Sequence, residues 1–202
     1  YPKLVDVLEV MVANNEDPHS RVELFHRIAT YHEQMIGNAA AAFDAYARAL
    51  RDDSGNQLTL GHIERLAEIT NSFEALSKLY QAESEKSLDV PRQVDLLSRL
   101  ARVYEQELAD VAKAIATLRR ILDAEFDNKP AVLGLDRLYS QTNAWPELAD
   151  ILKREIQLGE PNEIPTLQFR LGQTLQHQLG DRKGAVEVYR EILTENPTHE
   201  ST

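Results

Sequence analysis

The stretch WPELADIL, residues 145 to 152, has two counterparts in the same chain: YPKLVDVL at residues 1 to 8 and FEALSKLY at residues 73 to 80. The three copies start 72 residues apart, and each starts with an aromatic residue. Each also carries a leucine three positions later and another apolar residue three positions after that. Offsets of three and six lie on one face of an α-helix. The chain therefore repeats a helical segment at a constant period.

A second motif runs between these copies. It reads AAFDAYARAL from residue 41, KAIATLRRIL from residue 113 and GAVEVYREIL from residue 184. Interleaving the two motifs gives steps of 38, 34, 38, 34 and 37 residues. A period in this range is typical of a helical repeat array, in which each unit buries its apolar face against the next. The small residues shared by the second motif are expected at close helix contacts: Ala42, Ala114 and Ala185.

Turn residues and prolines divide the chain into helices. Short polar turns such as TNS at 70 to 72 and GD at 180 to 181 end one helix and cap the next. Proline precedes several apolar-periodic stretches, where its missing N–H costs nothing in a first helical turn. No stretch alternates as a strand does. We expect eleven helices, at 2–13, 19–36, 39–52, 57–70, 73–87, 91–108, 111–125, 130–142, 145–158, 164–179 and 182–195.

The last unit, LGQTLQHQLGDRKGAVEVYREILTENP from residue 171, resembles the tetratricopeptide repeat (TPR). The unit from Pro130 also matches the family's pattern, with Leu135, Tyr139, Trp145 and Leu148 in order. The positions that carry the resemblance in the last unit are Leu171, Gly172, Gly180, Asp181, Ala185, Tyr189, Asn196 and Pro197. The resemblance implies an all-α fold, a right-handed α-solenoid (superhelix) of about five TPR-like helix-turn-helix pairs plus one leading helix.

This sequence departs from the family pattern in two ways. The units that start near Pro18, Pro91 and Pro165 carry an extra residue in the first helix or its turn, and Leu76 and Leu148 replace a small residue. The departures leave related helical hairpin arrays, such as half-a-TPR and SNAP-like solenoids, as alternative families.

We expect one repeat domain over residues 1–202. Residue 1 aligns with the second helix of a pair, so the segment 2–13 is an orphan second helix and the chain is expected to be an excerpt of a longer protein. The expected pairs are 18–53, 56–88, 91–126, 129–160 and 164–197.

The amino-acid composition argues against several classes of function. The chain has no Cys, which excludes disulfides, thiol nucleophiles and thiolate metal sites. A net charge of −11 argues against nucleic acid and anionic lipid, both of which attract a basic surface. No apolar run approaches the roughly 18 residues of a membrane span, so membrane insertion is not expected. We expect a cytoplasmic location, with the periplasm as the alternative.

No residue pattern indicates catalysis, a cofactor or a metal site. The six histidines lie at 19, 26, 32, 62, 177 and 199, and HEQMI at 32 to 36 lacks the second histidine of a zinc-protease helix. No phosphate loop, nucleophile elbow or calcium-binding series is present. The protein is therefore not expected to be an enzyme. Most aromatic residues at repeat positions are assigned to helix packing: Tyr1, Tyr46, Phe73, Tyr80, Tyr104, Tyr139, Trp145 and Tyr189.

The family resemblance also implies a binding surface, because first helices of such arrays line a concave groove that holds peptides or partner helices. Arg65, Arg102 and Arg137 take corresponding places in three first helices and suit an acidic peptide or a chain terminus. The alternative is that each arginine pairs with an acidic neighbour such as Glu68 or Glu105. The other groove positions are Thr30, Glu33, Gln34, Glu68, Glu105, Gln106, Ser140, Gln141, Gln173, Gln176 and His177.

Three hypotheses for function follow. The leading one is a non-catalytic protein–protein interaction scaffold that holds a peptide or a partner subunit in this groove. The second is an accessory region that positions substrate for a multidomain enzyme or signalling protein. The third is an assembly element that self-associates through an exposed apolar face at the end of the array.

Overall fold

A computed structural model describes residues 2–195 of the chain. Tyr1, the signature residues Asn196 and Pro197, and His199 lie outside the described residues. The chain divides into two compact units, Tyr1–Asp110 and Val111–Thr202. The division falls between the two helices of the pair expected at 91–126, so each unit is described by itself.

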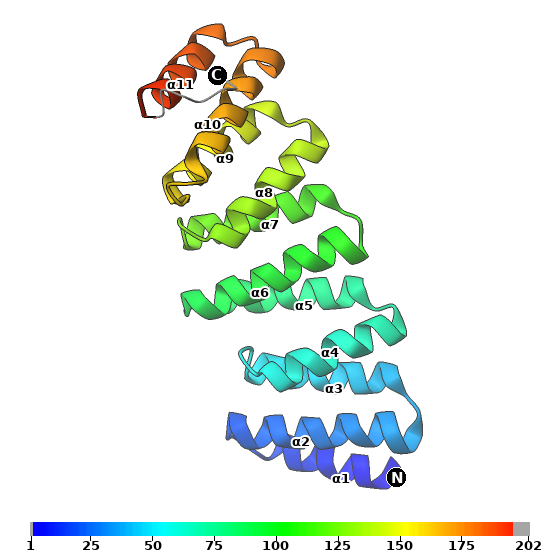
Figure 1. Ribbon diagram of the computed structural model, residues 1–202. Helices are drawn as coiled ribbons and strands as arrows, with labels where there is room; N and C mark the ends of the chain where they lie inside the picture. Colours follow the sequence, from blue (N-terminus) through cyan, green and yellow to red (C-terminus); the bar gives the residue numbers. More distant parts are fainter. Residues whose placement is uncertain (1, 196–202) are drawn as a thin grey trace. The chain divides into compact units, whose positions relative to one another are not determined.

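The described residues are helical and contain no strand (Figure 1), which confirms the all-α helical-repeat fold. The expected helices occur with bounds that differ by at most two residues, apart from three that end in a π-helical turn. Within each unit, successive helices are antiparallel neighbours joined by short turns (Figure 1). The first unit contains α1 Pro2–Ala13, α2 Pro18–Thr30, η1 Tyr31–Ile36, α3 Ala39–Asp52, α4 Gln57–Thr70, α5 Phe73–Lys86, α6 Val90–Arg102 and η2 Val103–Glu107. The second contains α7 Val111–Ala124, α8 Lys129–Thr142, α9 Trp145–Leu158, α10 Ile164–Gln173, η3 Thr174–Gln178 and α11 Arg182–Glu195.

Side-chain caps start several of these helices. Asp17 accepts a hydrogen bond of 2.9 Å from the backbone N–H of Ser20, and Asp89 accepts one of 2.9 Å from that of Arg92. Asn38, Asn56 and Asn128 cap α3, α4 and α8 in the same way. Each cap satisfies an N–H that the helix cannot pair internally, and proline occupies the first turn of α2, α6, α8, α9 and α10.

The turn after α4 and the turn after α8 have the same short form. Asn71 and Asn143 adopt left-handed backbone conformations, with φ of 52° and 57°. The residue after each asparagine donates its backbone N–H to the carbonyl five residues earlier in the chain. Ser72 donates to Ala67 at 2.9 Å, and Ala144 donates to Tyr139 at 3.0 Å. This is the Schellman arrangement, which satisfies carbonyls at a helix end.

The helices α2, α6 and α10 end differently, with one more residue before the chain reverses. Each of them continues directly into a π-helical turn: η1, η2 and η3. The residue with left-handed backbone is Gly37, Ala109 or Gly180. The residue after it donates its backbone N–H to the carbonyl six residues earlier in the chain. These bonds measure 2.8, 2.7 and 2.8 Å. The helices expected at 19–36, 91–108 and 164–179 are therefore not α-helical to their ends, because the extra residue of these units is taken up in a π turn.

Each unit has a continuous apolar core. Ala42, Ala114 and Ala185 are at most 1% exposed, as expected for close-contact positions. The ring of Tyr189 lies against the Cα of Gly172, where a side chain would clash. The largest fully buried side chains of the first unit are Leu8, Phe25, Ile28, Leu50, Leu60, Ile63, Leu66, Leu76, Tyr80, Leu96, Leu97 and Leu100. Those buried in the second unit include Ile121, Val132, Leu135, Leu138, Leu148, Leu152 and Ile192.

The three π turns differ at their left-handed residue, which allows a matched test. Ala109 holds a φ of 51° that costs a residue with a Cβ about 1 kcal/mol, whereas Gly180 holds a similar φ of 69° without this cost. We expect Ala109→Gly to raise the free energy of unfolding by about 0.5–1 kcal/mol and Gly180→Ala to lower it by about 1 kcal/mol. Urea unfolding followed by circular dichroism measures both. Effects of the same sign would contradict the turn geometry.

Candidate functional site

The residues predicted to line a groove are all at the surface of the first helices and their π turns. None of them is buried: Glu33, Glu105, Thr30 and Ser140 are half-buried, and the others are exposed. They lie on α2 and η1, on α4, on α6 and η2, on α8 and its last turn, and on α10 and η3.

In the first unit, the predicted residues meet in a pocket between α4, the start of α5 and the end of α6 with η2. We name it the Phe73 pocket, and its volume is about 440 Å³. Its lining residues are Gly61, Glu64, Arg65, Glu68, Phe73, Leu76, Arg102, Val103, Gln106 and Glu107. The structure thus brings together four predicted residues, Arg65, Glu68, Arg102 and Gln106.

The second unit has a pocket of the same construction, the Trp145 pocket, with a volume of about 370 Å³. Its lining residues are Ser140, Trp145, Leu148, Arg170, Gln173, Thr174, His177 and Gln178. Phe73 and Trp145 are 72 positions apart, and Gln106 and His177 are 71 apart, so the two pockets use the same positions of the repeat. Predicted residues Ser140, Gln173 and His177 lie here.

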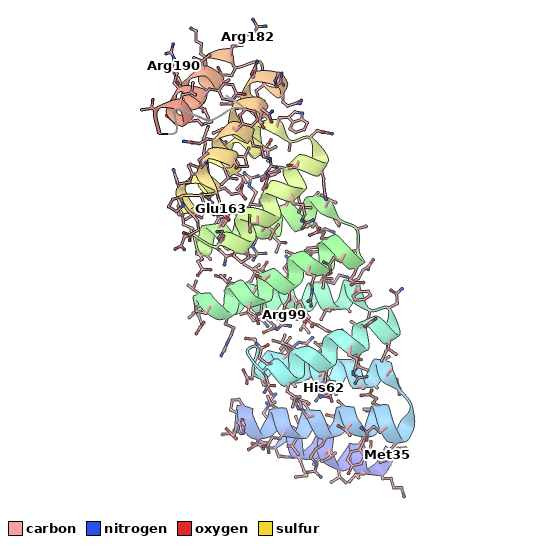
Figure 2. The ribbon with its side chains drawn as sticks, viewed as in Figure 1. Met35, His62, Arg99, Glu163, Arg182 and Arg190 are labelled. Carbon is pink, nitrogen blue, oxygen red and sulfur yellow. The ribbon has the colours of Figure 1, made fainter. Side chains whose placement is uncertain are left out.

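A third pocket, of about 340 Å³, lies beside η1 and contains the predicted residue Thr30. Its other lining residues are His26, Arg27, Tyr31 and Met35, and Met35 is labelled in Figure 2. Each of the three π turns therefore contributes to a pocket of its own. π-helical turns occur frequently at functional sites, since they redirect side chains locally. The predicted residues that line none of these pockets are Glu33, Gln34, Glu105, Arg137, Gln141 and Gln176.

The assignment of Phe73 and Trp145 to helix packing was incomplete. Tyr46, Tyr80, Tyr104 and Tyr139 are indeed buried, whereas Phe73, Trp145 and Tyr189 are only half-buried. Phe73 and Trp145 begin their helices, and part of each ring faces a pocket. Their place at the first position of a helix, next to the turn, is the sequence signal that distinguishes them from the buried tyrosines.

The arginines of the Phe73 pocket are paired with carboxylates. Arg65 forms an ion pair of 2.7 Å with Glu33, and this hydrogen bonding lowers the pKa of Glu33. Arg102 forms one of 3.1 Å with Glu64. Pairing was the alternative expected for these residues, but the partner of Arg65 is Glu33 on the preceding first helix and not Glu68 on its own. Arg137 has an interaction of its own as well. The arginines are therefore not a row of unpaired positive charges.

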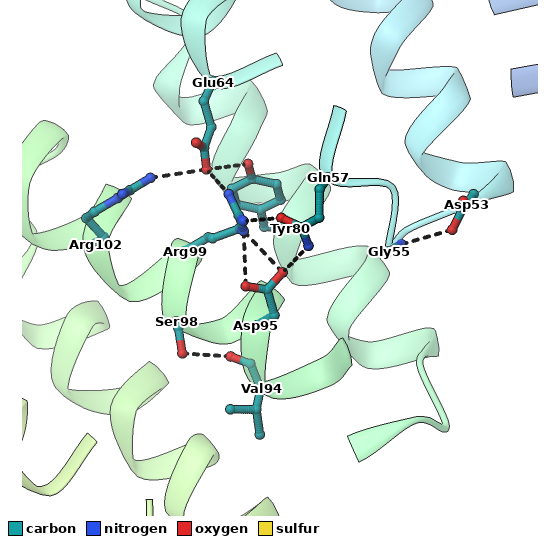
Figure 3. A network of polar contacts seen from close by, with 10 residues as sticks. All are labelled: Asp53, Gly55, Gln57, Glu64, Tyr80, Val94, Asp95, Ser98, Arg99 and Arg102. Atoms are coloured by element: carbon teal, nitrogen blue, oxygen red, sulfur yellow. Dashed lines mark hydrogen bonds and ion pairs between the residues drawn. The ribbon is translucent and has the colours of Figure 1, made fainter. Parts of the chain in front are cut away.

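Glu64 is the centre of a network between α4, α5 and α6 (Figure 3). One of its oxygens accepts hydrogen bonds from Arg99 at 2.8 Å and from the Tyr80 hydroxyl at 3.0 Å. Burial, followed by the negative charge of Glu64, raises the pKa of Tyr80. Arg99 also donates to Gln57 at 2.8 Å and to Asp95 at 3.2 Å.

The second unit has the corresponding ion pair. Arg170 donates two hydrogen bonds of 2.6 Å to Asp136 and a third of 2.8 Å to Ser140. Asp136 follows Glu64 by 72 positions and Arg170 follows Arg99 by 71. The Arg170–Asp136 pair is bidentate and therefore directional, so it fixes the spacing of α8 and α10. Arg99 makes a single hydrogen bond to Glu64 between α6 and α4. Arg99, Arg170, Glu64 and Asp136 were not among the predicted site residues, because a contact between helices about 35 positions apart leaves no local pattern.

Two histidines of the first unit lie near one aromatic side chain. His26, Tyr46 and His62 form an aromatic cluster, in which Tyr46 stacks on His62 with ring centres 4.8 Å apart. Burial lowers the pKa of His26, and His26 also contacts the hydroxyl of Thr59 at 2.7 Å. Residues 2–195 contain no group of His, Asp and Glu side chains arranged to hold a metal. None of the helices in this range has the length and apolar character that crossing a bilayer requires.

Two segments of the chain match a known family of helical repeats. The tetratricopeptide repeat model matches residues 95–124 and 167–199. No curated protein matches the chain significantly. The fold is similar to YrrB, described as a TPR protein with an unusual peptide-binding site, with 14% identity over 98% of this chain and 96% of that one and a TM-score of 0.48. It is also similar to MamA, with 16% identity, coverage of 89% and 95% and a TM-score of 0.48. A third similar structure is pilF of Pseudomonas aeruginosa, with 17% identity over 89% of this chain and 78% of that one and a TM-score of 0.47.

The arginine pairs make different contributions to stability. The Arg99 side chain is 21% exposed and bonds three acceptor residues, whereas the Arg65 side chain is 42% exposed and bonds one. We expect Arg99→Ala to lower the free energy of unfolding by about 1–3 kcal/mol, because it strands partly buried acceptors. Arg65→Ala should cost less than about 1 kcal/mol, as exposed ion pairs do. Urea unfolding of both variants tests this ranking, and equal costs would contradict it.

Proposed function

We propose, from the premise that this chain is a tetratricopeptide-like helical-repeat protein, that it is an interaction scaffold that binds an extended peptide or a segment of a partner subunit. The repeats support a protein-interaction scaffold, and repeats of this kind are typically non-catalytic. The observation that carries the finer proposal is the recurrence of one pocket at equivalent positions in the two units, each with an aromatic side chain at its wall.

The chemistry of the pockets indicates how a peptide would be held. The exposed parts of the Phe73 and Trp145 rings offer apolar anchors, and a few buried anchors supply most of the affinity of an interface. Gln106 and Gln173 also line the two pockets, and their amides both donate and accept hydrogen bonds. An extended peptide exposes N–H and C=O groups that such amides pair with.

The arginines bear on the charge of the partner. Arg65 and Arg102 are engaged with Glu33 and Glu64, and the Phe73 pocket also contains Glu68 and Glu107. A ligand carboxylate would have to share these arginines, which have further N–H donors, instead of meeting unpaired charges. An acidic segment is therefore one class of partner to test, and not a requirement of the proposal.

Trp145 is the only tryptophan of the chain and lies at the wall of a pocket, so its fluorescence reports on that pocket. We expect peptides selected from a displayed random library on the whole chain to change Trp145 emission on titration. The double variant Gln173→Ala/His177→Ala should weaken the binding of such peptides at least about tenfold, a loss of 1.4 kcal/mol. Lys153→Ala, which changes an exposed residue of α9 outside the pocket, is the control.

Selected peptides that bind the double variant as tightly as the original chain, with no change in Trp145 emission, would contradict the proposal. Replacing Asp and Glu by Asn and Gln in the same peptides tests the charge of the partner. A loss of binding on that replacement, reproduced by Arg102→Gln, would identify acidic segments as ligands. Unchanged binding would assign recognition to the aromatic and amide side chains alone.

Self-association is a second candidate function, favoured by α1. Val7, Val10 and Met11 on this helix are 55%, 61% and 47% exposed. A contiguous exposed apolar face favours contact with a second copy. We expect light scattering to show an increase in mass with concentration, which Val7→Glu/Val10→Glu would abolish. A constant monomer mass for the original chain would remove this candidate.

A further inference from the structure

Two buried glutamates occupy equivalent positions in the two units but have different surroundings. Glu83 and Glu155 are 72 positions apart and are 4% and 6% exposed. In the first unit, Lys86 donates a hydrogen bond of 2.8 Å to Glu83. In the second unit, the position equivalent to Lys86 is Leu158. The second glutamate therefore lacks the ammonium group that the first one has.

Glu155 lines a pocket of about 390 Å³ formed by the start of α8, the end of α9 and the start of α10, which we name the Glu155 pocket. Glu163, labelled in Figure 2, belongs to the connector before α10 and to the lining of this pocket. The walls are largely apolar, with the side chains of Val132, Leu133, Leu158 and Leu167. None of its residues lines the Phe73 or Trp145 pocket.

One carboxylate oxygen of Glu155, Oε2, is buried without a hydrogen bond within the described residues. The charged groups that act on it are Asp136 and Lys129 from α8, Arg170 from α10, and Glu163 from the connector. Arg170 is held by Asp136 at 2.6 Å and Lys129 by Glu163 at 3.5 Å, so both cations already have partners.

The surroundings of Glu155 disfavour its ionised form and so raise its pKa. Burial, followed by the negative charge of Asp136, raises the pKa of Glu155 to about 7. A buried carboxylate without a partner is unfavourable when ionised, and a cation that reaches it removes that cost. The site is therefore complementary to a positively charged group with an apolar stem.

We propose that the Glu155 pocket binds the side chain of a lysine from a partner protein, with its ammonium group on Glu155 and its methylene stem along the leucine and valine walls. The contact between Lys86 and Glu83 in the first unit is an example of the same pairing within the chain. Lysine fits better than arginine, because a compact ammonium group matches a single carboxylate and a flexible four-carbon stem matches an apolar channel. This proposal does not depend on peptide binding in the Phe73 and Trp145 pockets.

The first test uses n-butylammonium as a lysine side-chain analogue on the whole chain, followed by NMR of the methyl groups of Leu133, Leu158 and Leu167. We expect saturable shifts with n-butylammonium at pH 8 and none with the neutral N-butylacetamide. Butylguanidinium should bind more weakly than n-butylammonium. The titration midpoint of the Glu155 carboxyl carbon should fall when n-butylammonium is present, which an apolar pocket without ion pairing would not produce.

Variants distinguish the contribution of the proposed ion pair to probe binding from that of the apolar walls. Glu155→Gln should weaken n-butylammonium at least tenfold, whereas Glu160→Gln, an equal charge change at an exposed residue of the same connector, should not. Leu158→Lys reproduces the Lys86 arrangement and should both block the probe and raise the melting temperature. Circular dichroism checks that each variant is folded.

Several outcomes would overturn the proposal. Equal binding of the neutral analogue, or unchanged affinity in Glu155→Gln, would reduce the site to an apolar cavity. Binding that persists in Leu158→Lys would place the probe elsewhere, and a preference for butylguanidinium would exclude lysine as the ligand. The absence of saturable shifts at any probe concentration would remove the site. Each of these results leaves the Trp145 fluorescence assay unaffected, so failure of one proposal is distinguishable from failure of the other.

Discussion

The structure depends on how alternate hairpins accommodate one extra residue in the first helix. An extra residue within an α-helix rotates every later residue by about 100° and would turn apolar side chains out of the core. In this chain the rotation is confined to the last turn, which becomes π-helical and closes with a hydrogen bond over six residues. The helix before the turn and the helix after it keep their buried faces. The cost is a locally widened turn, and that turn forms part of a pocket in each case.

Much of the fold can be predicted from the sequence, because its signals are local. Periodic leucines, capping Asn and Asp residues, and Gly or Asn at the turns locate the helix ends to within two residues. The buried positions of Ala42 and Ala114 follow from the repeated motif in the same way. The π turns were detectable only as a surplus residue, since a π turn differs from an α turn in its hydrogen bonding.

The candidate site was only partly predictable. The register identified Arg65, Gln106 and His177 as surface residues of first helices, but it could not say that Arg65 is paired with Glu33. Such a contact joins two helices whose spacing depends on packing throughout the unit. The partial exposure of the Trp145 ring likewise depends on how closely η3 approaches α9, a distance that residue types alone do not determine.

The repeating element is a pair of unlike hairpins, one with a π turn and one with a Schellman turn, and its length is about 72 residues. An aromatic residue at the start of α5 or α9 faces a π turn that belongs to the next hairpin. Removing or adding a single hairpin would place two turns of the same kind in succession and break this match. A change in length that keeps this match between aromatic residue and π turn therefore takes two hairpins at a time, so the structural unit of the pockets is the pair of hairpins and not the single one.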